Sequence, residues 1–306
     1  MTTSPDAANP ARPARALPPT LLLAIGVAAL SAMDATIKHL SATNHTLIVV
    51  LGRYVFGTLF SLAIWLQAGR PAISAGMWRA HGLRGAIIAV AATTFFWSLT
   101  VLPLAEAVTL AFFYPLIAPF VALAVLGERP RMTSLVAAGF GFAGVVVALQ
   151  GAPDAESNPR YWLGVAAVIA STIAFAFSII LMRARAPLDG APVVGLLASF
   201  IPGLIVAGPA IMFATPPRPA DWPFFVLLGA LAAAGMYLLA RAYAKAEAQQ
   251  LAPIHYSELL WAALIGYFVF AETPRPQVFA GAALIIAACL FAAYDERRIA
   301  AASRQA

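Results

Sequence analysis

The chain consists of apolar runs of about 20 residues, which are separated by short stretches of glycine, proline and charged residues. Within the runs, apolar positions neither alternate as in a half-buried strand nor form a single stripe as in an amphipathic surface helix. About 20 apolar residues let a helix cross the hydrocarbon layer of a bilayer. The sequence therefore predicts an all-α polytopic membrane protein. Ten transmembrane helices are expected at residues 17–39, 45–67, 82–102, 105–127, 132–150, 161–183, 192–214, 222–244, 249–271 and 276–294.

The overall composition also indicates a membrane environment. Hydrophobic residues make up 62% of the 306 residues, charged residues make up 10%, and the mean hydropathy is +0.85. An ordinary soluble domain has a lower apolar share, because it could not cover so much apolar surface. A soluble enzyme or binding domain is therefore excluded.

Two segments far apart in the chain repeat the same lettering. Residues 105–131 open with Ala-Glu-Ala and close with Glu-Arg-Pro-Arg, and residues 246–275 open with Ala-Glu-Ala and close with Glu-Thr-Pro-Arg. The opening triplets lie 141 residues apart and the closing motifs 144, so the copies differ by a three-residue insertion. In an apolar chain such an echo indicates a duplicated unit, which is how many transporters are built.

The duplication divides the ten expected helices into two sets of five. Because five is odd, the second set must enter the membrane from the opposite side, so the halves are expected to be inverted repeats. The first run lacks a convincing Ala-x-Ala cleavage site, which favours a retained helix over a removed signal peptide. The expected organisation is a disordered cytoplasmic N-terminus (1–16), a first five-helix repeat (17–150), a polar loop (151–160), a second repeat (161–294) and a cytoplasmic tail (295–306).

The distribution of Lys and Arg predicts the orientation. On the side of the N-terminus we count fourteen: Arg12, Arg15, Arg70, Arg79, Arg84, Arg129, Arg131, Arg183, Arg185, Arg241, Lys245, Arg297, Arg298 and Arg304. The other side has four: Lys38, Arg160, Arg218 and Arg275. Basic loops stay in the cytoplasm, so both termini are expected there, in the cytoplasmic (inner) membrane. The net charge of +6 then needs no nucleic-acid partner, because anionic lipid accounts for it.

These features together resemble a known family. Ten spans, the five-plus-five duplication and a fourth helix of each half that ends in Leu-Gly-Glu-Arg-Pro (126–130) or Phe-Ala-Glu-Thr-Pro (270–274) are similar to the EamA-type transporters of the drug/metabolite transporter superfamily. Residues 251–272 are similar to the ninth helix of that family. The resemblance implies a carrier with a central cavity between its halves, most often an exporter of amino acids or other metabolites. The aromatic content of the helices favours the amino-acid exporters, including those for aromatic amino acids.

Charged residues inside the spans are the first candidates for a substrate site, because an ionisable group in hydrocarbon is costly unless it faces water or a partner. Arg53 lies about two turns into the second run, where it either holds helices together or lines the cavity. Asp34 and Lys38 are spaced i, i+4 and are expected to pair on one helix face. Glu258 shares a face with His255, and this pair could bind a substrate ammonium, carry a coupling proton or simply link helices.

Aromatic residues and prolines complete the expected site. Tyr and Trp within a span need polar partners that lipid does not offer, although some aromatic residues will face lipid. The aromatic candidates for the cavity are Tyr54, Trp97, Tyr114, Tyr237, Tyr256 and Trp261. Proline removes a backbone hydrogen bond and bends a helix, so Pro115, Pro119 and Pro253 are expected to break the fourth and ninth helices as gates or cavity walls.

Three functions remain open at this point. A secondary exporter of small metabolites explains the duplication, the inversion and the buried charges together. An uptake or exchange carrier for another class, such as nucleotide sugars or drugs, would need more converging cationic groups than Arg53 and Arg241 offer for an anionic substrate. A membrane-embedded enzyme is the least supported, because four scattered His, one Cys and no phosphate-binding loop form no catalytic motif. The expected partners are a small-molecule substrate, the lipid bilayer and a possible coupling proton, without cofactor or metal.

Overall fold

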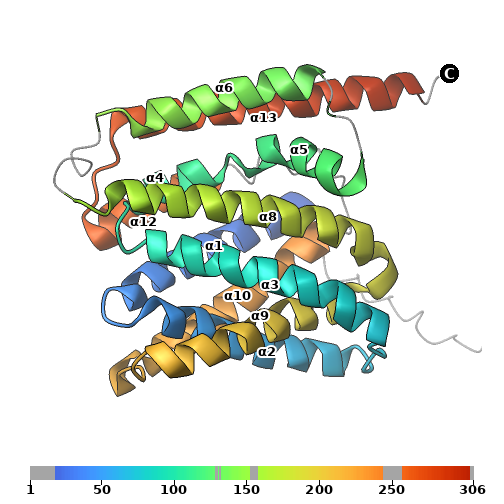
Figure 1. Cartoon of the computed structure of the whole chain (residues 1–306), viewed down its shortest axis with the longest axis vertical. Helices are drawn as coiled ribbons and strands as arrows, with labels where there is room; N and C mark the ends of the chain where they lie inside the picture. The colour runs from blue at the N-terminus through green and yellow to red at the C-terminus, as the bar shows by residue number, and fades with distance from the viewer. Residues whose placement is uncertain (1–17, 128–129, 131, 152–157, 244–256, 304–306) are drawn as a thin grey trace, which may run out of the picture.

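The computed structural model describes residues 18–127, 130, 132–151, 158–243 and 257–303, and within them the chain is helical without any strand (Figure 1). The first half contains α1 (Pro19–Ser41), α2 (Thr46–Gln67), α3 (Ala75–Ser98), α4 (Leu104–Ala111), α5 (Tyr114–Leu126) and α6 (Met132–Leu149). The second half contains α8 (Tyr161–Asp189), α9 (Ala191–Phe213), the short 3₁₀ helix η1 (Pro219–Asp221), α10 (Trp222–Tyr243), α12 (Ser257–Phe270) and α13 (Pro276–Ser303).

Each of the ten predicted runs contains a helix, and the fourth is divided into α4 and α5. Among the described residues, five helices, α1, α2, α8, α9 and α10, are long and apolar enough to cross a membrane. Helices α4 and α5 are bent by 45° relative to each other and add a sixth span if the pair is counted as one. The apolar parts of α6, α12 and α13 are shorter. The chain is thus a polytopic membrane protein, and ten crossings remain a prediction. Helix α3 is less apolar than expected because it begins at Ala75, so that its first turns include Arg79, His81 and Arg84.

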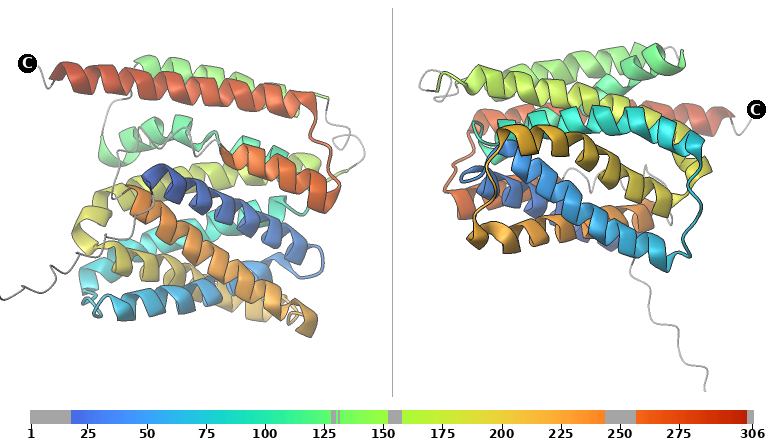
Figure 2. Two further views of the ribbon diagram at one scale, coloured as in Figure 1. Left: turned by 180° about the vertical axis from the view of Figure 1, so that it is seen from behind. Right: turned by 60° about the horizontal axis from the view of Figure 1, so that its bottom comes forward.

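The helices pack in pairs that join the two halves. Helix α1 packs on α10, α3 on α8, α2 on α9 and α6 on α13, while α12 contacts α1 and α4, and α5 contacts α8. The second half repeats the order of the first, so α1 corresponds to α8, α2 to α9, α3 to α10, α4 and α5 together to α12, and α6 to α13. When each helix is replaced by its counterpart, every packing pair becomes either itself or another pair of this set. Helices α6 and α13 lie side by side along one edge of the molecule (Figures 1 and 2).

Two of the matched pairs are closed by polar contacts at opposite ends of the molecule. Asn44 follows α1 and donates a hydrogen bond of 2.7 Å to Asp221, which precedes α10. His81, near the start of α3, lies 3.0 Å from Asp189 at the end of α8, and both side chains are buried. The two contacts correspond to each other, because the end of α1 and the start of α10 in the first contact have as counterparts the end of α8 and the start of α3 in the second. They lie at opposite ends of the molecule because α8 begins at the end where α1 stops. The halves therefore have opposite polarity with respect to these contacts.

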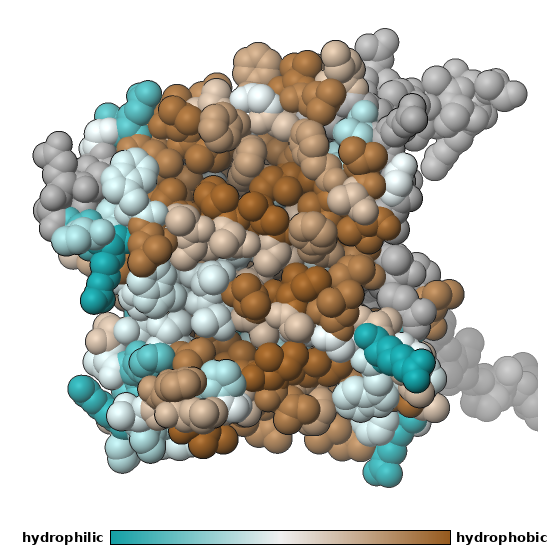
Figure 3. Space-filling view, viewed as in Figure 1, coloured by the Kyte–Doolittle hydropathy of each residue, from teal (hydrophilic) through white to brown (hydrophobic). Residues whose placement is uncertain are grey.

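The surface between the two ends is apolar. In Figure 3 the hydrophilic residues gather toward the two lateral edges, and hydrophobic residues cover most of the face between them. Large apolar side chains such as Ile211 and Phe268 are more than three-quarters exposed. A soluble monomer does not expose apolar surface on this scale, so this surface is the one that contacts lipid.

A close helix crossing at Gly144 gives a testable consequence for stability. A methyl group built at Gly144 of α6 would lie 2.9 Å from the carbonyl oxygen of Gly281 in α13, whereas one built at Gly139, also in α6, meets nothing within 4 Å. We expect Gly144→Ala to destabilise the fold by about 1–3 kcal/mol, because backbone atoms must move apart. Gly139→Ala is the matched control and should leave the thermal midpoint in detergent unchanged or higher, since alanine favours helix. Equal midpoints for the two variants would contradict this close crossing.

Candidate functional site

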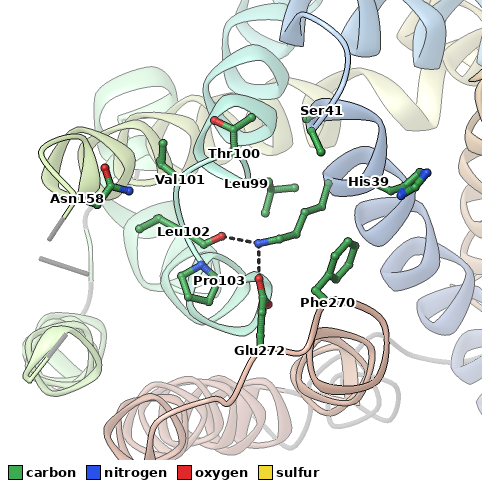
Figure 4. Close-up of a pocket in the computed structure, with 12 residues that line it drawn as sticks. His39, Ser41, Leu99, Thr100, Val101, Leu102, Pro103, Asn158, Phe270 and Glu272 are labelled. Atoms are coloured by element: carbon green, nitrogen blue, oxygen red, sulfur yellow. Dashed lines mark hydrogen bonds and ion pairs between the residues drawn. The ribbon is translucent and has the colours of Figure 1, made fainter. Parts of the chain in front are cut away.

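An ion pair between the two halves lies where α1 ends, which we call the Glu272 end. The Lys38 ammonium of α1 lies 2.5 Å from the Glu272 carboxylate, in the segment after α12. The same ammonium donates a hydrogen bond of 2.7 Å to the carbonyl oxygen of Leu102 and lies 5.6 Å from the centre of the Phe270 ring (Figure 4). Lys38 thus joins the ends of α1, α3 and α12.

The backbone after α12 holds Glu272 in place. Helix α12 ends at Phe270, and Ala271 adopts a left-handed conformation with φ 54°. The chain then turns back, so that the Glu272 N–H donates to the Gly266 carbonyl at 2.9 Å. The Glu272 carboxylate also accepts a hydrogen bond of 2.9 Å from the N–H of Leu104, the first residue of α4. That N–H has no partner within its own helix, so Glu272 caps α4 as well as binding Lys38.

A second ion pair lies beside the first. Arg275 lies 2.8 Å from the carboxylate of Glu106, and its guanidinium also donates to the Gln150 carbonyl at 2.8 Å. Glu106 is buried in α4 and accepts a hydrogen bond from the Tyr161 hydroxyl at the start of α8. We call Lys38, Glu106, Tyr161, Glu272 and Arg275 the cross-half network. It brings the opening motif of the first echo segment against the closing motif of the second.

A pocket of about 630 Å³ adjoins this network. Lys38 and Glu272 line it together with Phe270 and the residues that follow α3, and Asn158 lies at its far side (Figure 4). The ion pair is therefore next to space that water can enter. The pocket lies at the end of the helices and not among the apolar side chains of the core.

Three further charged residues gather among the helices. Asp34 of α1 is 6% exposed and lies close enough to Arg53 of α2 for their opposite charges to attract. It is also close enough to Glu258 of α12 for two negative charges to repel. Asp34 precedes the end of α1 by seven residues and Arg53 follows the start of α2 by seven, which puts both about 10 Å below the Glu272 end. We call these three residues the charged cluster. Both halves contribute to it.

Neighbouring groups orient the cluster. The Arg53 guanidinium carbon lies 4.6 Å from the centre of the Tyr54 ring, a cation–π stack that fixes the direction of the side chain. Tyr54 itself is 1% exposed. Ser31 lies on the face of α1 that carries Asp34, and its buried hydroxyl has no hydrogen-bond partner among the described residues. An orphan hydroxyl costs about 1–3 kcal/mol, which a bound polar ligand or water would offset.

The other predicted aromatic residues that the structure describes lie on α3, α5, α10 and α12. Tyr237 is 46% exposed and stacks under Arg241, whose guanidinium carbon lies 5.6 Å from its ring centre. Trp261 is exposed on α12, whose buried face consists of Ala262, Ala263 and Gly266. Trp97 is partly buried in α3, and Tyr114 packs edge-on against Phe175 at 5.2 Å between ring centres.

Of the two helices predicted to be broken by proline, only the fourth has its predicted break within the described residues. The chain breaks between Ala111 and Tyr114, and Pro115 stands in the first turn of α5 and not in the middle of a helix. Pro119 lies inside α5. A proline is tolerated in the first turn because no N–H is needed there, so the break precedes Pro115. His255, Tyr256 and Pro253 lie outside the described residues.

Sequence reasoning missed much of the cross-half network. It paired Lys38 with Asp34, whereas Lys38 binds Glu272 and Asp34 belongs to the charged cluster. It counted Arg275 as a loop charge and gave Glu106 no role. The echo motifs contained a usable signal, because Glu106, Glu272 and Arg275 are all parts of them.

Comparison with known proteins identifies the type of protein. A family model described as the EamA-like transporter family matches residues 18–150 and, a second time, residues 162–294. The chain belongs to the EamA-like transporter family. It is therefore a membrane transporter of the drug/metabolite type, and its relatives are named as transporters and not as enzymes.

Relatives of this EamA-family protein carry different substrates. An S-adenosylmethionine uptake transporter of Rickettsia bellii is 26% identical over 269 residues, which cover 88% of this chain and 90% of that protein. A riboflavin transporter of Brucella anthropi is 27% identical, covering 80% and 87%. The pseudopaline exporter CntI of Pseudomonas aeruginosa is 25% identical, covering 88% and 94%. None of these three is named as an amino-acid exporter, and their names include both uptake and export.

A solved crystal structure has the same fold as this EamA-family chain. It covers 92% of this chain and 98% of its own, with a TM-score of 0.64 and 20% sequence identity. At this identity the likeness supports the fold alone.

Proposed function

We propose that the protein is a secondary transporter that exports amino acids, or metabolites that carry an amino-acid group, across the cytoplasmic membrane. The charged cluster is the observation that carries this proposal. Asp34 and Glu258 offer two carboxyl groups and Arg53 offers one guanidinium, and they come from both halves. Charges inside a membrane protein are kept for function, because placing them there is costly.

The chemistry of the charged cluster fits a zwitterion. An ammonium group would bind between the two carboxylates, and a carboxylate would bind the guanidinium in bidentate form, since Arg presents a planar fork of donors. S-adenosylmethionine, the substrate named for one relative, carries both groups. Riboflavin, named for another, carries neither, so the family scaffold supports more than one substrate class.

Alternating access between inverted halves is the proposed mechanism. The matched helix pairs and the two polar contacts at opposite ends support this mechanism, because the two halves make equivalent contacts while their helices run in opposite directions. The Glu272 end is proposed to face outward. Lys38, Arg160, Arg218 and Arg275, the four basic residues expected outside, belong to segments at this end, and the basic majority is expected at the other.

Counterflow in proteoliposomes tests the proposed function. Vesicles loaded with an unlabelled compound accumulate the labelled compound only if one carrier exchanges both. We expect accumulation with neutral amino acids or S-adenosylmethionine, and none with a nucleotide sugar, which would leave two carboxylates facing an anion. Accumulation of nucleotide sugars alone would overturn the zwitterion assignment.

Uptake is the second candidate, because the Rickettsia relative is named as an uptake transporter. Net flux separates the two directions. Cells that express the protein and are loaded with a dipeptide of the substrate amino acid should release the free amino acid faster than control cells if the carrier exports.

A further inference from the structure

The cross-half network lies at the Glu272 end, and the charged cluster lies farther from this end along α1 and α2. Lys38 is one helical turn beyond Asp34 on α1, which is about 6 Å closer to that end. We propose that the Lys38–Glu272 and Arg275–Glu106 ion pairs form a lock that keeps this end closed, and that both pairs must separate before substrate can pass. The inference rests on the proposed function in assuming that the site opens to each side in turn.

The first argument for a lock is that each ion pair joins a residue of the first half to a residue of the second. Lys38 and Glu106 belong to the first half, on α1 and α4, whereas Glu272 and Arg275 belong to the segment between α12 and α13. Any motion that opens this end by separating α12 from α1 and α4 must break both pairs. The two pairs are also coupled, because Glu272 caps the first residue of α4 and Glu106 lies in the first turn of the same helix.

The surroundings of the pairs give the second argument, that the lock can be released. The side chains of Lys38, Glu272 and Arg275 are 14%, 17% and 16% exposed, so three of the four charges are shielded but still reached by water, whereas Glu106 is buried. The adjacent pocket of about 630 Å³ offers space in which separated charges can be hydrated. A fully buried pair would face a much larger cost of separation, because unpaired charges in a dry interior are strongly unfavourable.

A cysteine beneath the lock can report its opening. Thr109 of α4 lies one turn inward of Glu106 and is 1% exposed, and Cys289 is the one native cysteine. In a Thr109→Cys, Cys289→Ala protein in nanodiscs, a charged methanethiosulfonate reagent should label slowly. Lys38→Met and Glu272→Gln should raise the labelling rate about tenfold, which corresponds to loss of one partly shielded ion pair in a coupled network.

Two matched variants separate a lock from general loosening. Lys38→Arg keeps the charge and should label at the parent rate. Asn44→Ala removes a hydrogen bond at the same end that ties α1 to α10, outside the cross-half network, and should also leave the rate unchanged. The lock is overturned if Lys38→Met and Glu272→Gln label no faster than these controls while eluting as monodisperse protein, or if the parent protein already labels rapidly.

The labelling needs no substrate, so its outcome is independent of the counterflow result. Faster labelling in Lys38→Met together with no exchange of zwitterions would retain the lock and overturn the substrate assignment. Normal exchange of zwitterions with unchanged labelling in Lys38→Met would retain the substrate assignment and overturn the lock.

Discussion

Replacing Glu258 by glutamine is expected to lower the rate of amino-acid counterflow about a hundredfold. The amide keeps the size of the side chain but removes one of the two carboxyl groups that would bind the substrate ammonium, and charge-assisted hydrogen bonds contribute about 1.5–3 kcal/mol each. Asp34→Asn should have an effect of similar size, because Asp34 interacts electrostatically with both Glu258 and Arg53.

A matched control for Glu258→Gln is Asp221→Asn. It also converts a carboxylate to an amide, but at the Glu272 end, where Asp221 accepts hydrogen bonds from Thr43 and Asn44. We expect it to transport within about twofold of the parent, because hydrogen bonds at a partly exposed site contribute little and the amide oxygen can still accept them. If Glu258→Gln transports as well as Asp221→Asn, the charged cluster is a structural link between helices and not a substrate site.

Replacing Arg53 by methionine is expected to lower amino-acid counterflow as much as Glu258→Gln does, but to spare substrates that lack a carboxyl group. The guanidinium is oriented by the Tyr54 ring and would bind the substrate carboxylate in bidentate form. Counterflow of an amino acid should fall about a hundredfold, whereas that of the corresponding amine without a carboxyl group should change less than about threefold. Arg53→Lys should recover only part of the loss, because a single ammonium cannot reproduce the planar fork.

The selectivity of Arg53→Met separates recognition from support. A structural arginine would affect both substrates to the same extent, since its loss would deform the site for either. Equal losses for the amino acid and the amine, with unchanged thermal midpoints, would remove Arg53 from the substrate site.

The order of the helices could be predicted because the bilayer imposes a simple constraint. Every span must be apolar over a similar length, so the runs show directly where helices lie. The ends of the helices were harder to predict. Helix α3 begins at Ala75, α8 continues to Asp189 and α13 to Ser303, all beyond the expected spans. Hydropathy changes where a chain leaves the hydrocarbon, but backbone hydrogen bonding continues into the aqueous layer.

The contacts of the charged residues could be predicted only in part. Spacing of i, i+4 suggested an Asp34–Lys38 pair, but such pairs contribute only about 0.2–0.5 kcal/mol in an isolated helix. Lys38 instead binds a carboxylate and a carbonyl oxygen from other helices, in a partly shielded place where these contacts are stronger. Such partners become visible only when the helices are assembled. The location of Arg53 and Glu258 in apolar helices, by contrast, was readable from the sequence.

The Glu106–Arg275 contact has a consequence for the history of the chain. One partner comes from the opening motif of one copy and the other from the closing motif of the other copy, so neither copy can make this bond alone. In an ancestral pair of identical polypeptides the same bond would have formed twice, once at each face of the membrane. In a single chain the residues at each face can differ, so a transporter of this kind can have different release conditions on its two sides.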